Sequence, residues 1–327
     1  FMHKENMEDL RKLFIGLDKK VIVNGKGRIV PINFDNAATT PPFKRVLKKV
    51  LETSEYYGSI ARGDGQKSQY CSDLYEECRN YVLKYFNAPV EKYTAIFVSN
   101  TTDGLNKLSN ILIEKSDDIV ITTRMEHHSN DLPWRNKCNL KYVETDEKGR
   151  VKMDELEELL NKYNGQVKLV TVTGASNVTG YINDIKKIAK LTHRCGGKII
   201  VDGAQLVPHK KVSMISDDCE ENIDFLVYSA HKIYAPFGSG VIVGLIKYLD
   251  VKEPFVKGGG CVDYVFDDNV IWSEPPSLHE AGSPNFIGAM AMVRALEELK
   301  KIGCSPTDQS KRDNQSKKHN NSISPTE

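Results

Sequence analysis

Short apolar segments alternate with amphipathic segments along most of the chain, and this alternation constrains the fold more than any other feature. Such a repeat is typical of a mostly parallel sheet covered by helices on both faces. We therefore predict an α/β fold with a mostly parallel mixed sheet. The expected strands lie near residues 95–98, 119–122, 168–172, 198–202, 224–228 and 240–243, and the expected helices near 43–56, 68–86, 103–114, 153–163, 184–195 and 285–301.

The two ends of the chain differ from this pattern. A charged helix over residues 7–17 and a hairpin centred on 24–27 are expected to form an N-terminal arm over residues 1–34. A large domain would occupy residues 35–303. Residues 304–327 are almost entirely polar and are predicted to be disordered, because they cannot bury enough apolar surface to offset the entropy lost on ordering. Within 68–86, the predicted buried stripe consists of Tyr70, Leu74, Cys78, Tyr81, Val82 and Tyr85.

Composition excludes several classes of protein. The 45 Lys and Arg residues nearly balance the 44 Asp and Glu residues, which argues against nucleic acid as a partner. None of the seven cysteines forms a C-x-x-C pair, so neither a disulfide framework nor a zinc knuckle is indicated. With neither a signal peptide nor an apolar run of membrane-spanning length in view, we expect a cytoplasmic protein without membrane contact.

Lys232 and Asp202 each follow an apolar run, so both are expected at the carboxyl ends of strands, where α/β sheets bind their ligands. A lysine for a Schiff base and a carboxylate for a pyridine nitrogen are what pyridoxal phosphate requires of a protein. Alone, Lys232 reads as a surface residue and Asp202 as a turn or helix-cap residue. The pair predicts the cofactor.

Three further segments lie at expected strand ends. Thr101 and Thr102 open a helix whose free N–H groups could bind a phosphate, although an ordinary N-cap has the same sequence. His127 could stack on a ring and exchange protons; a metal site with His128 lacks a third ligand at recognisable spacing. Asn177 could bind a ring hydroxyl or a substrate carboxylate, or simply form a turn.

Together these residues resemble the class V, fold-type I family of pyridoxal-phosphate enzymes, and within it the SufS-like branch of cysteine desulfurases and selenocysteine lyases. The resemblance runs from about residue 35 to about residue 301. It rests on the ordered motifs N-A-A at 36–38, T-T-D-G at 101–104, M-E-H-H at 125–128, S-N-V-x-G at 176–180, V-D-G-A-Q at 201–205, S-x-H-K at 229–232, G-G-G at 258–260 and A-G-S-P-N at 281–285.

The resemblance implies roles for the residues at matching positions. Lys232 would carry the cofactor as a Schiff base, Asp202 would pair with the pyridinium, and His127 would stack on the ring as acid and base. Gln205 would bond the ring oxygen. The implied phosphate ligands are Thr101, Thr102, Ser229 and His231, together with Ser283 from the neighbouring subunit of a homodimer.

Arg62 matches a family arginine that lies near the substrate across the dimer interface, although a free surface arginine is the alternative. The family's nucleophilic cysteine and its carboxylate-binding arginine belong to a C-terminal small domain, for which this sequence has no counterpart. Cys261 and Cys304 are not assigned as substitutes. The large domain is therefore expected with its small domain truncated.

The function implied by the resemblance is conversion of L-cysteine to L-alanine with transfer of sulfur to an enzyme cysteine, in sulfur metabolism and iron–sulfur cluster assembly. A sulfur-acceptor protein would be a further partner. Two alternatives stay open: another class V aminotransferase, epimerase or lyase reaction, since the same cofactor site serves all of these, and a non-catalytic truncated paralogue.

Overall fold

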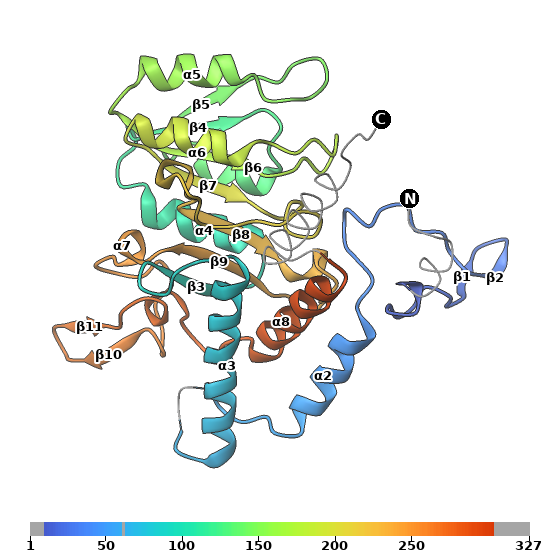
Figure 1. The fold of residues 1–327 in the computed structure, drawn as a ribbon. Helices are drawn as coiled ribbons and strands as arrows, with labels where there is room; N and C mark the ends of the chain where they lie inside the picture. The colour runs from blue at the N-terminus through green and yellow to red at the C-terminus, as the bar shows by residue number, and fades with distance from the viewer. Residues whose placement is uncertain (1–9, 61–62, 304–327) are drawn as a thin grey trace, which may run out of the picture.

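A seven-stranded sheet forms the centre of the molecule (Figure 1). The computed structural model describes residues 10–60 and 63–303. Strand order across the sheet is β3-β9-β8-β7-β6-β4-β5. The five strands from β8 to β5 are parallel, whereas β9 runs antiparallel to both β3 and β8, so the predicted mixed sheet is confirmed. The bounds are β3 (Tyr93–Val98), β4 (Ile119–Thr123), β5 (Asn139–Val143), β6 (Val167–Thr173), β7 (Lys198–Asp202), β8 (Phe225–Ser229) and β9 (Gly240–Leu245).

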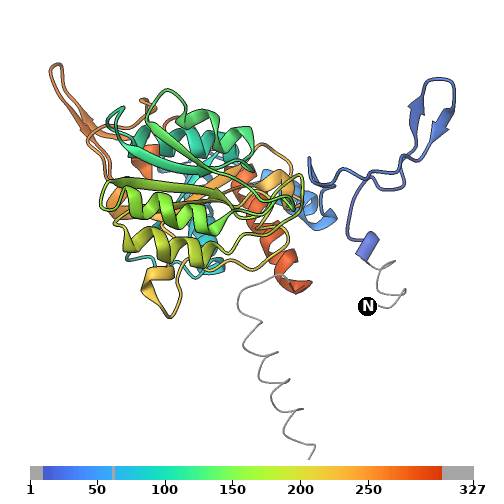
Figure 2. The same cartoon turned by 90° about the horizontal axis from the view of Figure 1, so that it is seen from above.

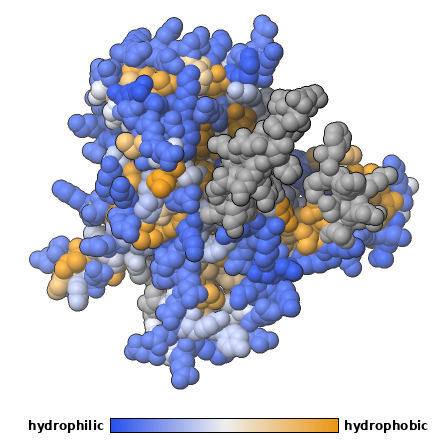
Figure 3. Space-filling model, in the orientation of Figure 1, coloured by the Kyte–Doolittle hydropathy of each residue, from blue (hydrophilic) through white to orange (hydrophobic). Residues whose placement is uncertain are grey.

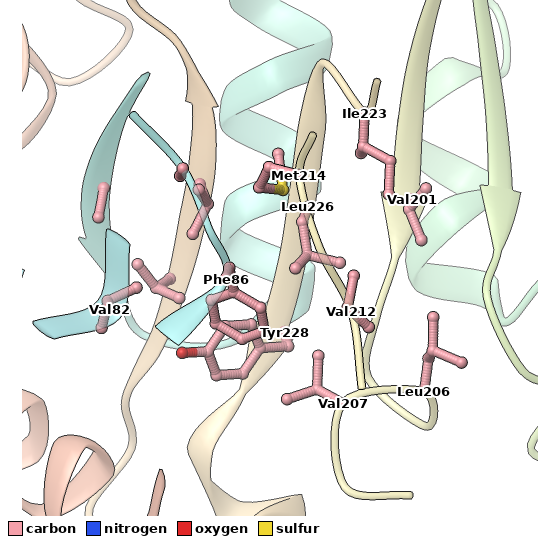
Figure 4. Packing of buried hydrophobic residues seen from close by; sticks show 14 of the residues in the cluster. Val82, Phe86, Val201, Leu206, Val207, Val212, Met214, Ile223, Leu226 and Tyr228 are labelled. Atoms are coloured by element: carbon pink, nitrogen blue, oxygen red, sulfur yellow. The ribbon is translucent and has the colours of Figure 1, made fainter. Parts of the chain in front are cut away.

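Helices cover both faces of this sheet because successive strand residues point to opposite sides. In β8, Phe225 and Val227 face the cluster around α4, whereas Leu226 and Tyr228 face the larger cluster on the other side. Tyr228 packs there against Phe86, with ring centroids 5.3 Å apart (Figure 4). The helices are α2 (Lys44–Ser54), α3 (Gln66–Tyr85), α4 (Thr101–Leu112), α5 (Met153–Lys162), α6 (Ile185–Arg194), α7 (Ile246–Leu249) and α8 (Phe286–Lys301).

Two hairpins project from opposite sides of this core (Figure 2). The expected N-terminal hairpin is confirmed as β1 (Val21–Val23) paired with β2 (Gly27–Ile29). The second, β10 (Val262–Val265) with β11 (Val270–Trp272), was not predicted. Apolar side chains show on both, with Ile22 74% and Val265 67% exposed, and they appear as orange patches at the two sides of Figure 3.

Three local predictions were wrong. The helix expected over 7–17 ends at Arg11 within the described residues, because Phe14 leaves it to form a bridge with Phe43. The edge strand β5 was missed, since its half-polar sequence Asn-Leu-Lys-Tyr-Val lacks an apolar run. Tyr70 is 43% exposed, because Cys71 and Tyr75 rather than Tyr70 and Leu74 are buried in the first half of α3. The rest of the predicted stripe is partly confirmed, since Cys78, Val82 and Tyr85 are buried and Tyr81 is half-buried.

The remaining expected strands and helices are present with small shifts of their ends. The predicted domain boundaries stay predictions, and residues 304–327 lie outside the described part of the chain. Within the described part, none of the helices is both long and apolar enough to cross a membrane. Because β4, β7 and β8 are parallel, their carboxyl ends and the N-terminus of α4 lie at one edge of the sheet.

Candidate active site

A cavity of about 630 Å³ opens at this edge of the sheet. Every predicted site residue except Ser283 and Arg62 contributes to its wall. The carboxyl ends of the strands therefore gather residues that are up to 131 positions apart between Thr101 and Lys232. The predicted residues that line the cavity are Thr101, Thr102, His127, Asn177, Asp202, Gln205, Ser229, His231 and Lys232.

Lys232 and Asp202 reach the cavity from neighbouring strands. Asp202 is the last residue of β7, and Lys232 ends the short 3-10 helix η4 (Ala230–Lys232) that follows β8. Burial raises the pKa of Asp202, and the hydrogen bond from the Ala204 N–H and the positive charge of Lys232 oppose this rise. Burial likewise lowers the pKa of Lys232, with Asp202 opposing. Each group thus makes the charged form of the other less costly in a poorly solvated site.

Asp202 also fulfils the alternative role that its position suggested. Its Oδ1 accepts a hydrogen bond from the backbone N–H of Ala204 at 2.9 Å, which is the turn interaction typical of a strand-end aspartate. The side chain is only 2% exposed, which is uncommon for a carboxylate. The turn fixes the carboxylate, and the same carboxylate lines the cavity.

The N-terminus of α4 supplies donors at a second wall. Asn100 is the N-cap, and its side chain accepts a hydrogen bond from the N–H of Asp103 at 2.9 Å. Thr101 therefore does not act as the cap. Its N–H and its hydroxyl both lie 2.7 Å from the Ser229 hydroxyl, and the Thr102 hydroxyl lies 2.7 Å from that of Ser129. Hydroxyl groups at a helix N-terminus form a suitable anion site.

His127 stands between these two walls with a defined tautomer. Its Nδ1 accepts a hydrogen bond from the backbone N–H of Ser129 at 3.1 Å, so in the neutral ring the proton resides on Nε2. Burial and the positive charge of Lys232 lower the pKa of His127. The ring is therefore neutral near pH 7 and has an N–H to donate. Among the described residues, no three His, Cys, Asp or Glu side chains are grouped to hold a metal ion.

The remaining predicted residues occupy varied positions. The Gln205 amide donates to the carbonyl of Ala37 at 2.7 Å, which ties the N-A-A turn to the cavity wall. His231 is half-buried, and its Nδ1 lies 3.1 Å from the Thr39 hydroxyl. Asn177 is exposed at the rim, in a loop after β6 where Ser176 organises the turn. Its turn role and its binding role remain compatible.

Two predicted residues lie elsewhere. Ser283 is exposed and lines a separate cavity of about 240 Å³, together with Asp103 and Lys107 of α4. It does not reach the main cavity of its own chain. Arg62 lies outside the described residues. Of the candidate thiols, Cys261 is fully buried and donates to the Gly258 carbonyl at 2.9 Å, and none of the described cysteines lines the cavity.

Glu126 does not line the cavity but supports the loop of His127, and the sequence analysis gave it no role. Its carboxylate accepts hydrogen bonds from the Thr123 hydroxyl and the Asn130 amide, both at 2.6 Å. Burial of the carboxyl group raises its pKa to about 8, and the charge of Asp202 adds to this rise. The sequence offered one signal for this role, because Glu126 is an acidic residue directly before the predicted strand-end residue His127. Asn130 also accepts from Thr171 at 2.6 Å, so Glu126 anchors the His127 loop to β6.

These features fit pyridoxal phosphate. The α4 N-terminus and its hydroxyl groups suit a phosphate, the buried Asp202 carboxylate suits a pyridine nitrogen, and Lys232 supplies an amine with a lowered pKa. No single one of these features is specific. Their convergence on one cavity is the arrangement that this cofactor needs.

Comparison with known proteins identifies the family. Residues 32–322 match the family model described as Aminotransferase class-V. The chain is 34% identical to a cysteine desulfurase of Wigglesworthia glossinidia brevipalpis, over 83% of this chain and 67% of that protein, and 35% identical to a probable cysteine desulfurase of Synechocystis, over 83% and 65%. The apo structure of cysteine desulfurase from Thermococcus onnurineus NA1 superposes with a TM-score of 0.75 at 32% identity, over 83% of this chain and 68% of that one.

This chain therefore spans about two thirds of the length of these relatives. The match covers the sheet, both helical layers and every motif on which the predicted resemblance rests, from residue 36 to residue 285. The predicted family is confirmed: the chain belongs to the class V aminotransferases, which are pyridoxal-phosphate-dependent enzymes.

Proposed function

We propose that the chain binds pyridoxal phosphate and acts on L-cysteine as a cysteine desulfurase, releasing L-alanine and passing the sulfur on as a persulfide. The main observation behind this proposal is that Lys232, just after β8, and Asp202, at the end of the neighbouring β7, line one cavity with the N-terminus of α4. The names of the most similar relatives support the choice of reaction.

Each proposed role follows from the geometry. When bound, the cofactor supplies an electron sink that weakens bonds at the substrate α-carbon. Asp202 provides the negative charge for a protonated ring nitrogen, which offsets the cost of keeping that carboxylate charged when buried. Lys232, with its lowered pKa, has a larger neutral fraction than an exposed lysine and is the better nucleophile. His127 lines the cavity, and its neutral ring carries on Nε2 a proton that it can donate.

A second candidate function is supported by the cysteines. None of the described cysteines lines the cavity, and the one on the glycine-rich loop, Cys261, is buried. Sulfur transfer would therefore use a thiol from outside the described residues. A transamination or elimination that leaves no sulfur on the protein needs no such thiol.

Absorption spectroscopy and product analysis test both candidates. We expect a visible absorption band when pyridoxal phosphate is added to the protein and its loss in Lys232→Ala. The band should remain in Lys210→Ala, which alters an exposed lysine outside the cavity wall. L-Cysteine with a reductant should then give equal amounts of sulfide and alanine. Keto acid in place of alanine would indicate the second candidate, with sulfide if the reaction is an elimination and without sulfide if it is a transamination. A folded wild type without the band would refute both candidates.

The assembly and setting are also proposals. We infer a homodimer in which Ser283 and Arg62 serve the neighbouring cavity, since Ser283 lies away from the cavity of its own chain. A sulfur-acceptor protein and a cytoplasmic role in iron–sulfur cluster assembly follow from the desulfurase proposal. We also propose that the chain is divided into an N-terminal arm, a large domain and a polar tail.

A further inference from the structure

The segment before α2 packs directly on the loop that carries Lys232. The carbonyl of His231, the residue before Lys232, accepts hydrogen bonds from the Thr40 N–H at 3.1 Å and from the Thr40 hydroxyl at 2.9 Å. The Thr39 hydroxyl lies 3.3 Å from the same oxygen. These contacts join parts of the chain that are 191 and 192 residues apart.

The Thr40 hydroxyl joins both sides of Lys232. While it donates to the His231 carbonyl, its oxygen accepts a hydrogen bond from the backbone N–H of Tyr234 at 2.8 Å. One hydroxyl thereby fixes the distance between the residue before Lys232 and the second residue after it. A valine at this position would have the same shape and could make neither bond.

Tyr234 needs such support because its backbone is in the left-handed region, with φ of 67°. A non-glycine residue keeps this conformation only where its surroundings impose it. Its carbonyl accepts from the N–H of Phe43 at 3.1 Å. Its ring packs against Phe43 and Phe14, with centroids 4.8 and 5.1 Å away, so the N-terminal arm also contacts the lysine loop.

We propose that Thr40 is a positioning residue for Lys232: its hydroxyl holds the loop between His231 and Tyr234 in the conformation that directs the lysine into the cavity. This inference rests on the proposed role of Lys232 in binding the cofactor. Thr40 itself does not line the cavity, so it would act only through the loop.

Three variants of Thr40 distinguish the effect of its hydroxyl from an effect on folding. Thr40→Val removes both hydrogen bonds of the hydroxyl at nearly constant volume, and Thr40→Ser retains them. Thr40→Ala also removes both hydrogen bonds, and it places no methyl group where the hydroxyl was. It serves as the second variant in case valine prevents folding. The matched control is Thr53→Val, because Thr53 is 1% exposed and its hydroxyl has no hydrogen-bond partner in the described part of the chain.

The first measurement uses the apoprotein, so it does not depend on the cofactor. Lys232 is labelled with an amine reagent over a range of pH and quantified by mass spectrometry of its peptide. The ionisable groups whose charge is coupled to that of Lys232 are Asp202, His127 and His231, which no variant alters. In Thr40→Val we expect the midpoint of labelling to move upward by about one pH unit, because a displaced Lys232 gains solvent. Thr40→Ser and Thr53→Val should match the wild type.

Two further readouts complete the test. Exchange of the Tyr234 amide hydrogen should accelerate about tenfold or more in Thr40→Val, because that amide loses its acceptor. Affinity for pyridoxal phosphate should fall about tenfold and recover in Thr40→Ser.

An unchanged Lys232 profile in folded Thr40→Val or Thr40→Ala would overturn the inference, as would an equal change in Thr40→Ser or Thr53→Val. If the labelling results hold while the wild type fails to bind pyridoxal phosphate, the proposed function fails and the positioning of Lys232 by Thr40 stands.

Discussion

Replacement of Glu126 by glutamine should change how the stability of the apoprotein depends on pH. The Glu126 carboxyl has an ordinary pKa of 4.5, and burial raises this to about 8 in the folded protein. The folded state therefore binds a proton that the unfolded state releases between these values. The stabilisation that this bound proton contributes is fully present below pH 4.5 and is lost as the pH rises toward 8. The interval of about 3.5 pH units corresponds to about 5 kcal/mol, at about 1.36 kcal/mol per unit.

Glutamine can keep both side-chain contacts of Glu126 without ionising. Its carbonyl can accept from the Asn130 amide, and its NH₂ group can donate to the Thr123 hydroxyl, which also accepts hydrogen bonds. We therefore expect Glu126→Gln to match the wild type within about 1 kcal/mol at pH 4.5 and to exceed its stability by several kcal/mol at pH 9. Asp202, whose pKa is also raised, is present in both proteins, so its direct contribution largely cancels in the comparison.

Urea denaturation of the apoproteins from pH 4.5 to 9 measures this difference. Fluorescence of the buried Trp134 is a suitable signal, since its indole N–H lies 3.4 Å from Asn130 in the same network. Glu147→Gln, at an exposed position in a turn, is the matched control and should leave the pH dependence unchanged. Parallel stability curves for Glu126→Gln and the wild type would refute the reasoning, because they would show that Glu126 takes up no proton on folding.

The remaining predictions concern a buried ion pair and the assembly. Arg79 and Glu280, both nearly buried, lie 2.9 Å apart, and Glu280 also accepts from the Phe97 N–H at 2.7 Å. Arg79→Met should lower the free energy of unfolding, measured in urea, by about 3–5 kcal/mol, because it leaves a buried carboxylate unpaired. Adding Glu280→Gln to this variant should recover part of the loss. If the effects of the two substitutions on the free energy of unfolding simply add, the pairing is contradicted. If Ser283 and Arg62 serve a neighbour, sedimentation should give a dimer with the cofactor bound, and a cofactor-bound monomer would disprove this placement.

The positions of Lys232 and Asp202 could be predicted from the sequence because they depend on local patterns. An apolar run followed by a polar residue indicates a strand end, and parallel strands bring their carboxyl ends to one edge. The same logic located His127 and Thr101, and the motif series identified the family. The prediction failed where the local pattern was weak, as in the half-polar strand β5.

The contacts that hold those residues in place depend on parts of the chain that only the tertiary structure brings together. Thr40 meets the Lys232 loop across 191 residues, and Arg79 meets Glu280 across 201. Neither contact can be recognised in the sequence from a hydrophobic period or from a motif.

The sequence by itself determined the six apolar strands and six helices of the core, the family and the strand-end residues, because hydrophobic period and turn chemistry are local properties. The tertiary structure alone decided that Asn100 rather than Thr101 caps α4, that Cys261 is buried, and that Glu126 lies beside the cavity with a raised pKa. Burial and solvation depend on what the rest of the chain packs around a residue, and this is why the pKa values of the site could not be inferred before the fold was known.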